Sequence, residues 1–123
     1  MSRRLLFGSL LGLIWAVFAT ALHPPLHGQS LAGLAAIGGT VVDASGAVVP
    51  GASVTVFNRQ IGLERKVATT DVGYFLVPSL PPASGYEVLV EKQGFAPYRA
   101  QDVQLQVGQS LSITARLEVA QQT

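Results

Sequence analysis

The sequence predicts an all-β protein, a seven-stranded antiparallel β-sandwich preceded by an N-terminal signal helix. Three observations support this prediction. Short segments after residue 36 alternate apolar and polar side chains with the period of two that is typical of strands. Clusters of Gly, Pro, Asn and Asp separate these segments at intervals of roughly 8 to 12 residues, as in β-sandwiches. No segment in this region repeats with the 3.6-residue period of an amphipathic helix.

Seven segments fit the strand pattern, and turn residues bound each of them. The first ends at a turn in which Gly46 can take a positive φ and Asp43 can accept backbone hydrogen bonds. The third is polar, and its charged side chains are typical of an edge strand. Pro78 is expected to end the fourth. The strands are expected over 36–43, 53–58, 63–70, 74–78, 86–92, 102–107 and 110–119.

The alternation also assigns the side chains that face inward. In 86–92, Tyr86, Val88 and Val90 share one face, so Glu87 and Glu91 are expected to point to solvent. The same reasoning gives the expected core of the sandwich: Val41, Val54, Val56, Phe75, Leu80, Tyr86, Val88, Val90, Val103, Leu105, Leu111, Ile113 and Leu117.

The N-terminus has the three-part pattern of a secretory signal. Arg3 and Arg4 precede an uncharged apolar run over 5–22, and small or helix-breaking residues follow. The sequence therefore predicts a signal peptide over 1–29 and a linker to about residue 36. An uncleaved anchor is the alternative, because about 18 apolar residues just suffice to cross a hydrocarbon core of roughly 30 Å. In that case the chain meets a membrane only through residues 1–22.

Composition narrows the class of protein further. The chain has 123 residues and no cysteine, which excludes a disulfide framework and a thiol nucleophile. Without Arg3 and Arg4, 6 basic residues face 7 acidic ones. A nearly neutral mature chain offers no basic face, so we expect no binding to nucleic acid. An exported protein without cysteines favours a bacterial source, with the periplasm, the outer membrane or the cell exterior as its location.

No set of residues supports catalysis. If the signal is cut beyond His27, the mature chain has no histidine, which excludes a Ser-His-Asp arrangement, a His base and a His-ligated metal together. His23 and His27 alone lack the third ligand of a metal site. Asp43, Asp71 and Asp102 lie at or near turns and do not follow a calcium-loop pattern. We therefore predict no catalytic residue, no metal ligand and no cofactor.

Three stretches, GTVVDASGAVVPGASVTV, TTDVGYFLVPSLPPASGYEVLVEKQGFAPY and VQLQVGQSLSITARL, resemble the carboxypeptidase regulatory-like domain. This resemblance implies a transthyretin-like (prealbumin-like) sandwich, a fold also grouped with carbohydrate-binding-like folds. It places the domain over 37–119, followed by a polar tail over 120–123. Such domains are appended to carboxypeptidases, to surface adhesins and to the N-terminus of TonB-dependent outer-membrane receptors. No plug or barrel follows Thr123, so a fragment, a truncated product or a free-standing module is expected.

The function expected from these features is that of an exported non-catalytic interaction or structural module. Its partner would be an envelope protein or a receptor, as in the N-terminal extension of a TonB-dependent receptor. The alternatives are a carbohydrate-binding module with a glycan as ligand and an accessory domain of a secreted peptidase. The candidate contact residues are Phe57 and Tyr74, expected to point outward, and Tyr98, expected in a loop. A further alternative, taken from adhesin modules, is a Lys-Asn isopeptide crosslink between Asn58 and Lys66 or Lys92.

Overall fold

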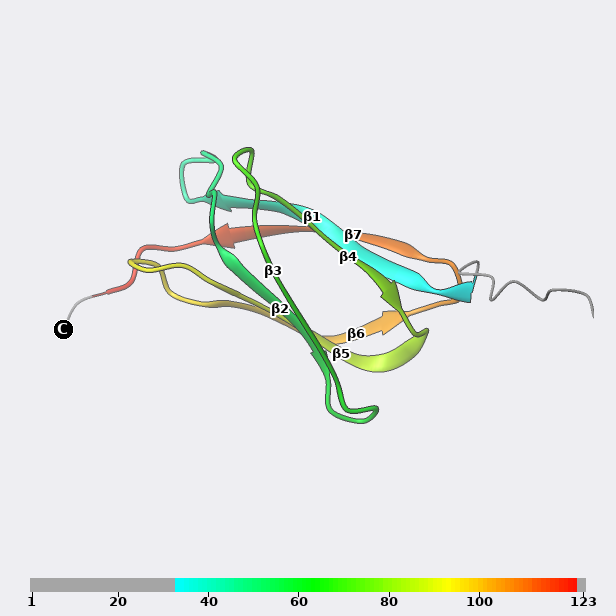
Figure 1. Cartoon of the computed structure of the whole chain (residues 1–123). Coiled ribbons are helices and arrows are strands. Elements are labelled where there is room, and N and C mark those ends of the chain that lie inside the picture. Colours follow the sequence, from blue (N-terminus) through cyan, green and yellow to red (C-terminus); the bar gives the residue numbers. More distant parts are fainter. Residues whose placement is uncertain (1–32, 122–123) are drawn as a thin grey trace, which may run out of the picture.

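The computed structural model describes residues 33–121. Its strands are β1 (Ala35–Asp43), β2 (Ser53–Asn58), β3 (Leu63–Ala68), β4 (Tyr74–Leu80), β5 (Ala83–Glu91), β6 (Tyr98–Leu105) and β7 (Ser110–Leu117). They form a three-stranded sheet of order β4-β1-β7 and a four-stranded sheet of order β3-β2-β5-β6, packed face to face (Figure 1). The predicted all-β sandwich is confirmed, while the expected signal over 1–29 lies outside the described residues.

The prediction that the strands pair antiparallel is wrong for one pair of strands. β1 and β7 run parallel in unbroken register, from Ala36 opposite Ser110 to Asp43 opposite Leu117. The other pairings between named strands are antiparallel. A short turn forces two strands into a hairpin, but β1 and β7 are the first and last strands, so no turn restrains their direction. Alternation of side chains is the same in both directions, so the sequence pattern could not distinguish them.

Pro78 does not end β4, contrary to the prediction. The strand continues to Leu80, and its pairing with β1 shifts register between Ala35 and Ile37, opposite this proline. Ser79, the next residue, has a φ of 61°. Proline is tolerated at such a bulge on an edge strand because no ladder hydrogen bond needs its missing N–H. The next strand along the chain, β5, starts earlier than expected, at Ala83.

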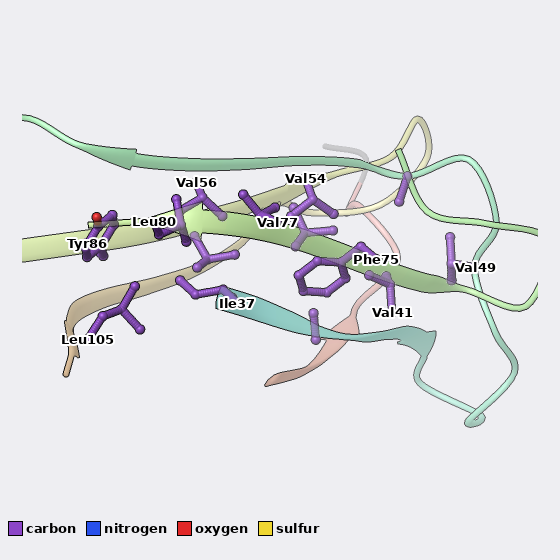
Figure 2. Close-up of a cluster of buried hydrophobic side chains, with 14 of the residues drawn as sticks. Ile37, Val41, Val49, Val54, Val56, Phe75, Val77, Leu80, Tyr86 and Leu105 are labelled. Carbon is purple, nitrogen blue, oxygen red and sulfur yellow. The ribbon is translucent and has the colours of Figure 1, made fainter. Parts of the chain in front are cut away.

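The core lies between the two sheets (Figure 2). All but three of the predicted core residues are buried, and Val103, Leu111 and Ile113 are only partly buried against the others. Alternation missed several buried residues because they are small, lie in loops or stand beside glycines. These are Ala35, Ile37, Val49, Ala52 and Ala115, while Val77, also buried, shares the inner face of β4 with Phe75.

The three-stranded sheet depends on a glycine at its centre. Gly39 in β1 has a φ of 155°, and a Cβ atom placed on it would lie 1.7 Å from the carbonyl oxygen of Ile113 in β7. No side chain fits in this space. The close parallel approach of β1 and β7 therefore requires glycine at this position.

The four-stranded sheet is held at one end by two buried side chains. Asn58 is fully buried, and its Nδ2 donates to the carbonyl oxygen of Ser84 at 2.9 Å, while its Oδ1 accepts from the N–H of Gln60 at 3.0 Å. The hydroxyl of Tyr86 donates to the carbonyl oxygen of Pro81 at 2.5 Å. Burial raises the pKa of Tyr86. These bonds satisfy backbone groups at the start of β5, in the β2–β3 loop and in the connection from β4 to β5.

Candidate functional site

The two aromatic residues expected to point outward lie on opposite faces of the molecule. Phe57 follows the inward-facing Val56 in β2, so it lies on the outer face of the four-stranded sheet. Tyr74 precedes the inward-facing Phe75 in β4, so it lies on the outer face of the three-stranded sheet. The two rings therefore cannot contribute to one binding surface.

Tyr98 does not lie in a loop, contrary to the prediction. It is the first residue of β6 and pairs with Val90 of β5, which is fully buried. Directly opposed residues share a face of the sheet, so the ring of Tyr98 packs against the core from its margin. The Tyr98 ring therefore has a structural role and shares no surface with Phe57 or Tyr74.

A depression in the outer face of the four-stranded sheet lies over Phe57. This depression, the Phe57 hollow, has a volume of about 480 Å³ on the outer face of the four-stranded sheet. Phe57 stands opposite Glu64 of β3 and Glu87 of β5, and the guanidinium carbon of Arg59 lies 5.5 Å from the centre of its ring, a cation–π distance. The hollow is lined by Thr55, Phe57, Asn58, Arg59, Gly62, Leu63, Glu64, Lys66, Leu89 and Glu91.

Charges of both signs surround the Phe57 hollow. Lys66 and Arg59 line it together with Glu64 and Glu91. Glu91 is exposed as predicted, but Glu87 is partly buried, and its Oε2 has no hydrogen-bond partner. The hollow thus has an apolar centre and a polar margin that carries charges of both signs. This pattern fits the surface of a polypeptide partner.

A smaller depression on the opposite face carries no charge. This depression, the Tyr74 groove, has a volume of about 200 Å³. Tyr74 is 43% exposed and Leu76 is 46% exposed, and a Cβ atom on Gly38 would lie only 3.5 Å from the Tyr74 hydroxyl. The groove therefore exists because Gly38 has no side chain to fill it. The groove is lined by Ala36, Gly38, Gly39, Tyr74, Leu76, Ser110, Leu111 and Ser112.

The isopeptide alternative does not fit the position of Asn58. A crosslink needs the amide of Asn58 in contact with a buried lysine, but Lys66 is exposed and Lys92 only half-buried. The amide nitrogen of Asn58 is instead hydrogen-bonded to the backbone at Ser84. Sequence reasoning placed Asn58 at the start of a loop and missed its role, which the following turn residues could have indicated.

Asp43 and Asp71 lie at turns as predicted, whereas Asp102 lies within β6. The Asp43 carboxylate accepts hydrogen bonds from the Ser45 hydroxyl at 2.6 Å, the Ser45 N–H at 2.8 Å and the Ala47 N–H at 3.0 Å. The hydrogen bond from the Ser45 hydroxyl, together with those from backbone N–H groups, lowers the pKa of Asp43. Within residues 33–121, no three His, Cys, Asp or Glu residues are grouped so that they could hold a metal ion. His23 and His27 lie outside this range.

Comparisons with known proteins identify the type of domain. A family model of the carboxypeptidase regulatory-like domain matches residues 36–118. A search of curated proteins gave no match. Over the same part of the chain that the structure describes, no helix is both long and apolar enough to span a membrane.

Solved structures share the fold at low sequence identity. The TIE protein of Bacillus anthracis is 19% identical with a TM-score of 0.59, and the match covers 71% of this chain and 17% of that protein. Catechol 1,2-dioxygenase of Pseudomonas arvilla C-1 is 16% identical with a TM-score of 0.60, over 73% of this chain and 54% of the enzyme. A candidate carbohydrate-binding protein of Bacteroides uniformis is 19% identical with a TM-score of 0.55, over 69% and 41%. This chain thus corresponds to one part of each larger protein.

Proposed function

The chain belongs to the carboxypeptidase regulatory-like domain family, and on this premise we propose that it is an exported, non-catalytic module that binds an envelope protein through the Phe57 hollow. The observation that carries the proposal is the hollow itself, a partly exposed aromatic centre with cationic and anionic side chains around it. Arginine and aromatic residues are enriched in protein interfaces, and mixed charge at the margin gives specificity toward a polypeptide.

The absence of catalysis is proposed from the chemistry of the described carboxylates. Asp43 is exposed and hydrogen-bonded within its own turn, which depresses its pKa and suits it poorly to act as a general base near neutral pH. Glu64 and Glu91 lie on an open sheet face that water reaches freely. The likeness to catechol dioxygenases is at 16% identity and concerns the fold, so it brings no activity to this chain.

Export and an envelope partner are proposed from the N-terminal residues. Arg3 and Arg4 followed by the apolar run over 5–22 would direct the chain out of the cytoplasm, to the periplasm, the outer membrane or the exterior. The partner proposed is the receptor or envelope protein beside which such a domain stands, as in the N-terminal extension of a TonB-dependent receptor. Replacing both arginines by glutamate should retain the chain in the cytoplasm, which cell fractionation measures.

The partner proposal is tested with variants on the two outer faces. The full chain with a C-terminal affinity tag is expressed in its bacterial host, and envelope proteins are crosslinked and co-purified with it. Phe57→Ala should reduce the captured receptor at least tenfold, because it removes the apolar centre of the hollow. Tyr74→Ala is the matched control, because it removes an exposed ring from the opposite face. Equal capture by Phe57→Ala, with its fold verified by circular dichroism, would refute the assignment.

Carbohydrate binding is the second candidate function, and the Tyr74 groove favours it. An exposed aromatic ring next to the hydroxyls of Ser110 and Ser112, without a charged side chain, suits a neutral sugar. Retardation of the chain in native gels that contain neutral polysaccharides, lost in Tyr74→Ala and kept in Phe57→Ala, would support this function in place of the first.

A further inference from the structure

Three of the four edge strands carry features that block pairing with another strand. β3 exposes Glu64, Arg65 and Lys66 in succession. β4 contains Pro78 and its bulge. β6 contains Asp102 with a φ of 56° and is irregularly paired with β5. Charges, proline and bulges are the means by which sheet edges avoid adding strands.

The fourth edge strand, β7, has none of these features. Its register with β1 is unbroken, and among its residues only Arg116 is charged. The N–H of Ala36 donates to the carbonyl oxygen of Gln109, and the carbonyl oxygen of Ile113 also faces β1. In a strand the backbone groups of successive residues point to opposite sides. The even-numbered residues of β7 therefore direct their N–H and C=O groups to the open edge.

The open edge has a defined length. Beyond β7 the same side of the chain is already paired, since Ala96 N–H donates to the Glu118 carbonyl at 2.8 Å and Ala120 N–H donates to the Gly94 carbonyl at 3.0 Å. At the other end, the chain turns at Gln109. The opening thus spans residues 110–116 and is centred on Ile113. The isolated antiparallel bridge between Phe95 and Val119 closes this side of the chain at that end.

The core is open beside this same edge. The predicted core residues that remain partly exposed, Val103, Leu111 and Ile113, all belong to β6 and β7. Val103 faces inward, because it pairs with the fully buried Tyr86. The seam between β6 and β7, defined by these three residues, is therefore an incompletely covered part of the core. A neighbour on the β7 edge would shield it.

We propose that β7 pairs antiparallel with β7 of a second copy of this chain, about a twofold axis at Ile113. This register places Ser112 opposite Thr114 of the second copy and Ser110 opposite Arg116 of the second copy. The outward backbone groups of these even-numbered residues then exchange hydrogen bonds, and the two three-stranded sheets join into one. Such a contact is isologous, so the same residues serve on both sides.

A second copy fits this edge better than an isolated strand of another protein. The only charge, on Arg116, meets a serine, so no like charges oppose each other. On the inner side Leu111 meets Ala115, a large residue beside a small one. The twofold axis also brings the two seams together beneath the joined sheet, so each copy covers the exposed apolar residues of the other. An isolated strand of another protein would pair with the edge but would leave the apolar residues of the seam uncovered.

The test uses two pairs of substitutions at the exposed residues Ser112 and Thr114, in the full chain as the bacterial host exports it. Sedimentation equilibrium should show a monomer–dimer equilibrium of the wild type, with a dissociation constant in the micromolar to millimolar range because one strand pair makes a small interface. Ser112→Glu with Thr114→Glu puts like charges opposite each other and should raise the constant at least tenfold. Ser112→Glu with Thr114→Lys puts opposite charges together and should restore the dimer.

The outcomes separate this proposal from others. A wild type that stays monomeric throughout that range, or a Glu/Glu variant that dimerises like the wild type, would overturn it. Capture of a synthetic β-strand peptide by a monomeric chain would also overturn it and assign the edge to another protein. Phe57→Ala should leave the dimer unchanged, so loss of the dimer and loss of the envelope partner are distinguishable. Both charge variants share the native N-terminal segment, so association through that segment cannot explain a difference between them.

Discussion

The two sheets of the sandwich are held together by different means. The three-stranded sheet relies on backbone conformation, since Gly39 lets β1 and β7 approach where any side chain would collide with Ile113. The four-stranded sheet relies on buried side chains, since Asn58 and Tyr86 hydrogen-bond the backbone of the start of β5 and of two loops at its end. A parallel pair of distant strands has no turn to fix it, so close backbone contact takes the place of a hairpin. Antiparallel neighbours such as β2 and β3 are joined by a turn, and a buried side chain stabilises that turn.

The largest effect should come from Gly39→Ala, which attacks the backbone contact of the three-stranded sheet. Its Cβ would overlap the Ile113 carbonyl, and alanine at a φ of 155° is strained as well. We expect a loss of more than ~3 kcal/mol in the free energy of unfolding, measured by urea denaturation. Gly62→Ala is the matched control, because it has a positive φ but open space around it, and should lose only about 1–2 kcal/mol. Equal losses would show that strain alone matters.

Asn58→Ala should have the next largest effect, on the four-stranded sheet. It leaves the Ser84 carbonyl and the Gln60 N–H without their partner at a partly buried position, so we expect a loss of roughly 2 kcal/mol in urea denaturation. Ser84→Ala is the control, because the bond uses the main-chain oxygen of Ser84 and survives that change. A neutral Asn58→Ala would mean that the side-chain bonds do not secure this sheet.

Tyr86→Phe removes only the hydrogen bond to the Pro81 carbonyl and keeps the buried ring. We expect a loss of about 1 kcal/mol in the free energy of unfolding. Tyr74→Phe serves as control, since the Tyr74 ring is 43% exposed on the opposite face and should tolerate loss of its hydroxyl. If both variants unfold at the same urea concentration, the Tyr86 bond contributes nothing.

The smallest effect should be that of Asp43→Asn in the turn after β1, and it should depend on pH. Hydrogen bonds lower the pKa of Asp43 in the folded chain below its ordinary value of 3.8, so the folded state favours the carboxylate. The resulting stability is present at neutral pH and is lost as the pH falls below that value toward the folded-state pKa. The melting temperatures of wild type and Asp43→Asn should therefore differ at pH 7 and converge toward pH 2. A constant difference would contradict the linkage.

Much of the fold could be predicted because alternation and turn chemistry act locally. The pairs Val54 and Val56, and Val88 and Val90, are buried as expected because each side chain follows the period of its strand. Direction between β1 and β7 could not be predicted, since it depends on residues far apart in the sequence. Strand ends around Pro78 were missed because a bulge, which the alternation does not reveal, accommodates the ring.

The candidate site was less predictable than the fold. Alternation correctly predicted that Phe57 and Tyr74 point outward. It could not predict that they lie on opposite faces of the sandwich, because that depends on which sheet each strand joins. Tyr98 was misplaced because its strand begins before any alternating pattern. The hollow over Phe57 and the position of Arg59 above the ring require three strands and a loop together, which no single segment encodes.

The parallel pairing of the first and last strands has a mechanical consequence. Because β1 enters at the end where β7 also starts, the chain arrives and leaves at opposite ends of the sheet, separated by the 9 residues of β1 or roughly 30 Å. Tension applied through the two ends would therefore pull β1 and β7 past each other, so that their hydrogen bonds are loaded together in shear instead of opening one by one. Such a domain could carry force along a tether without unravelling from either side.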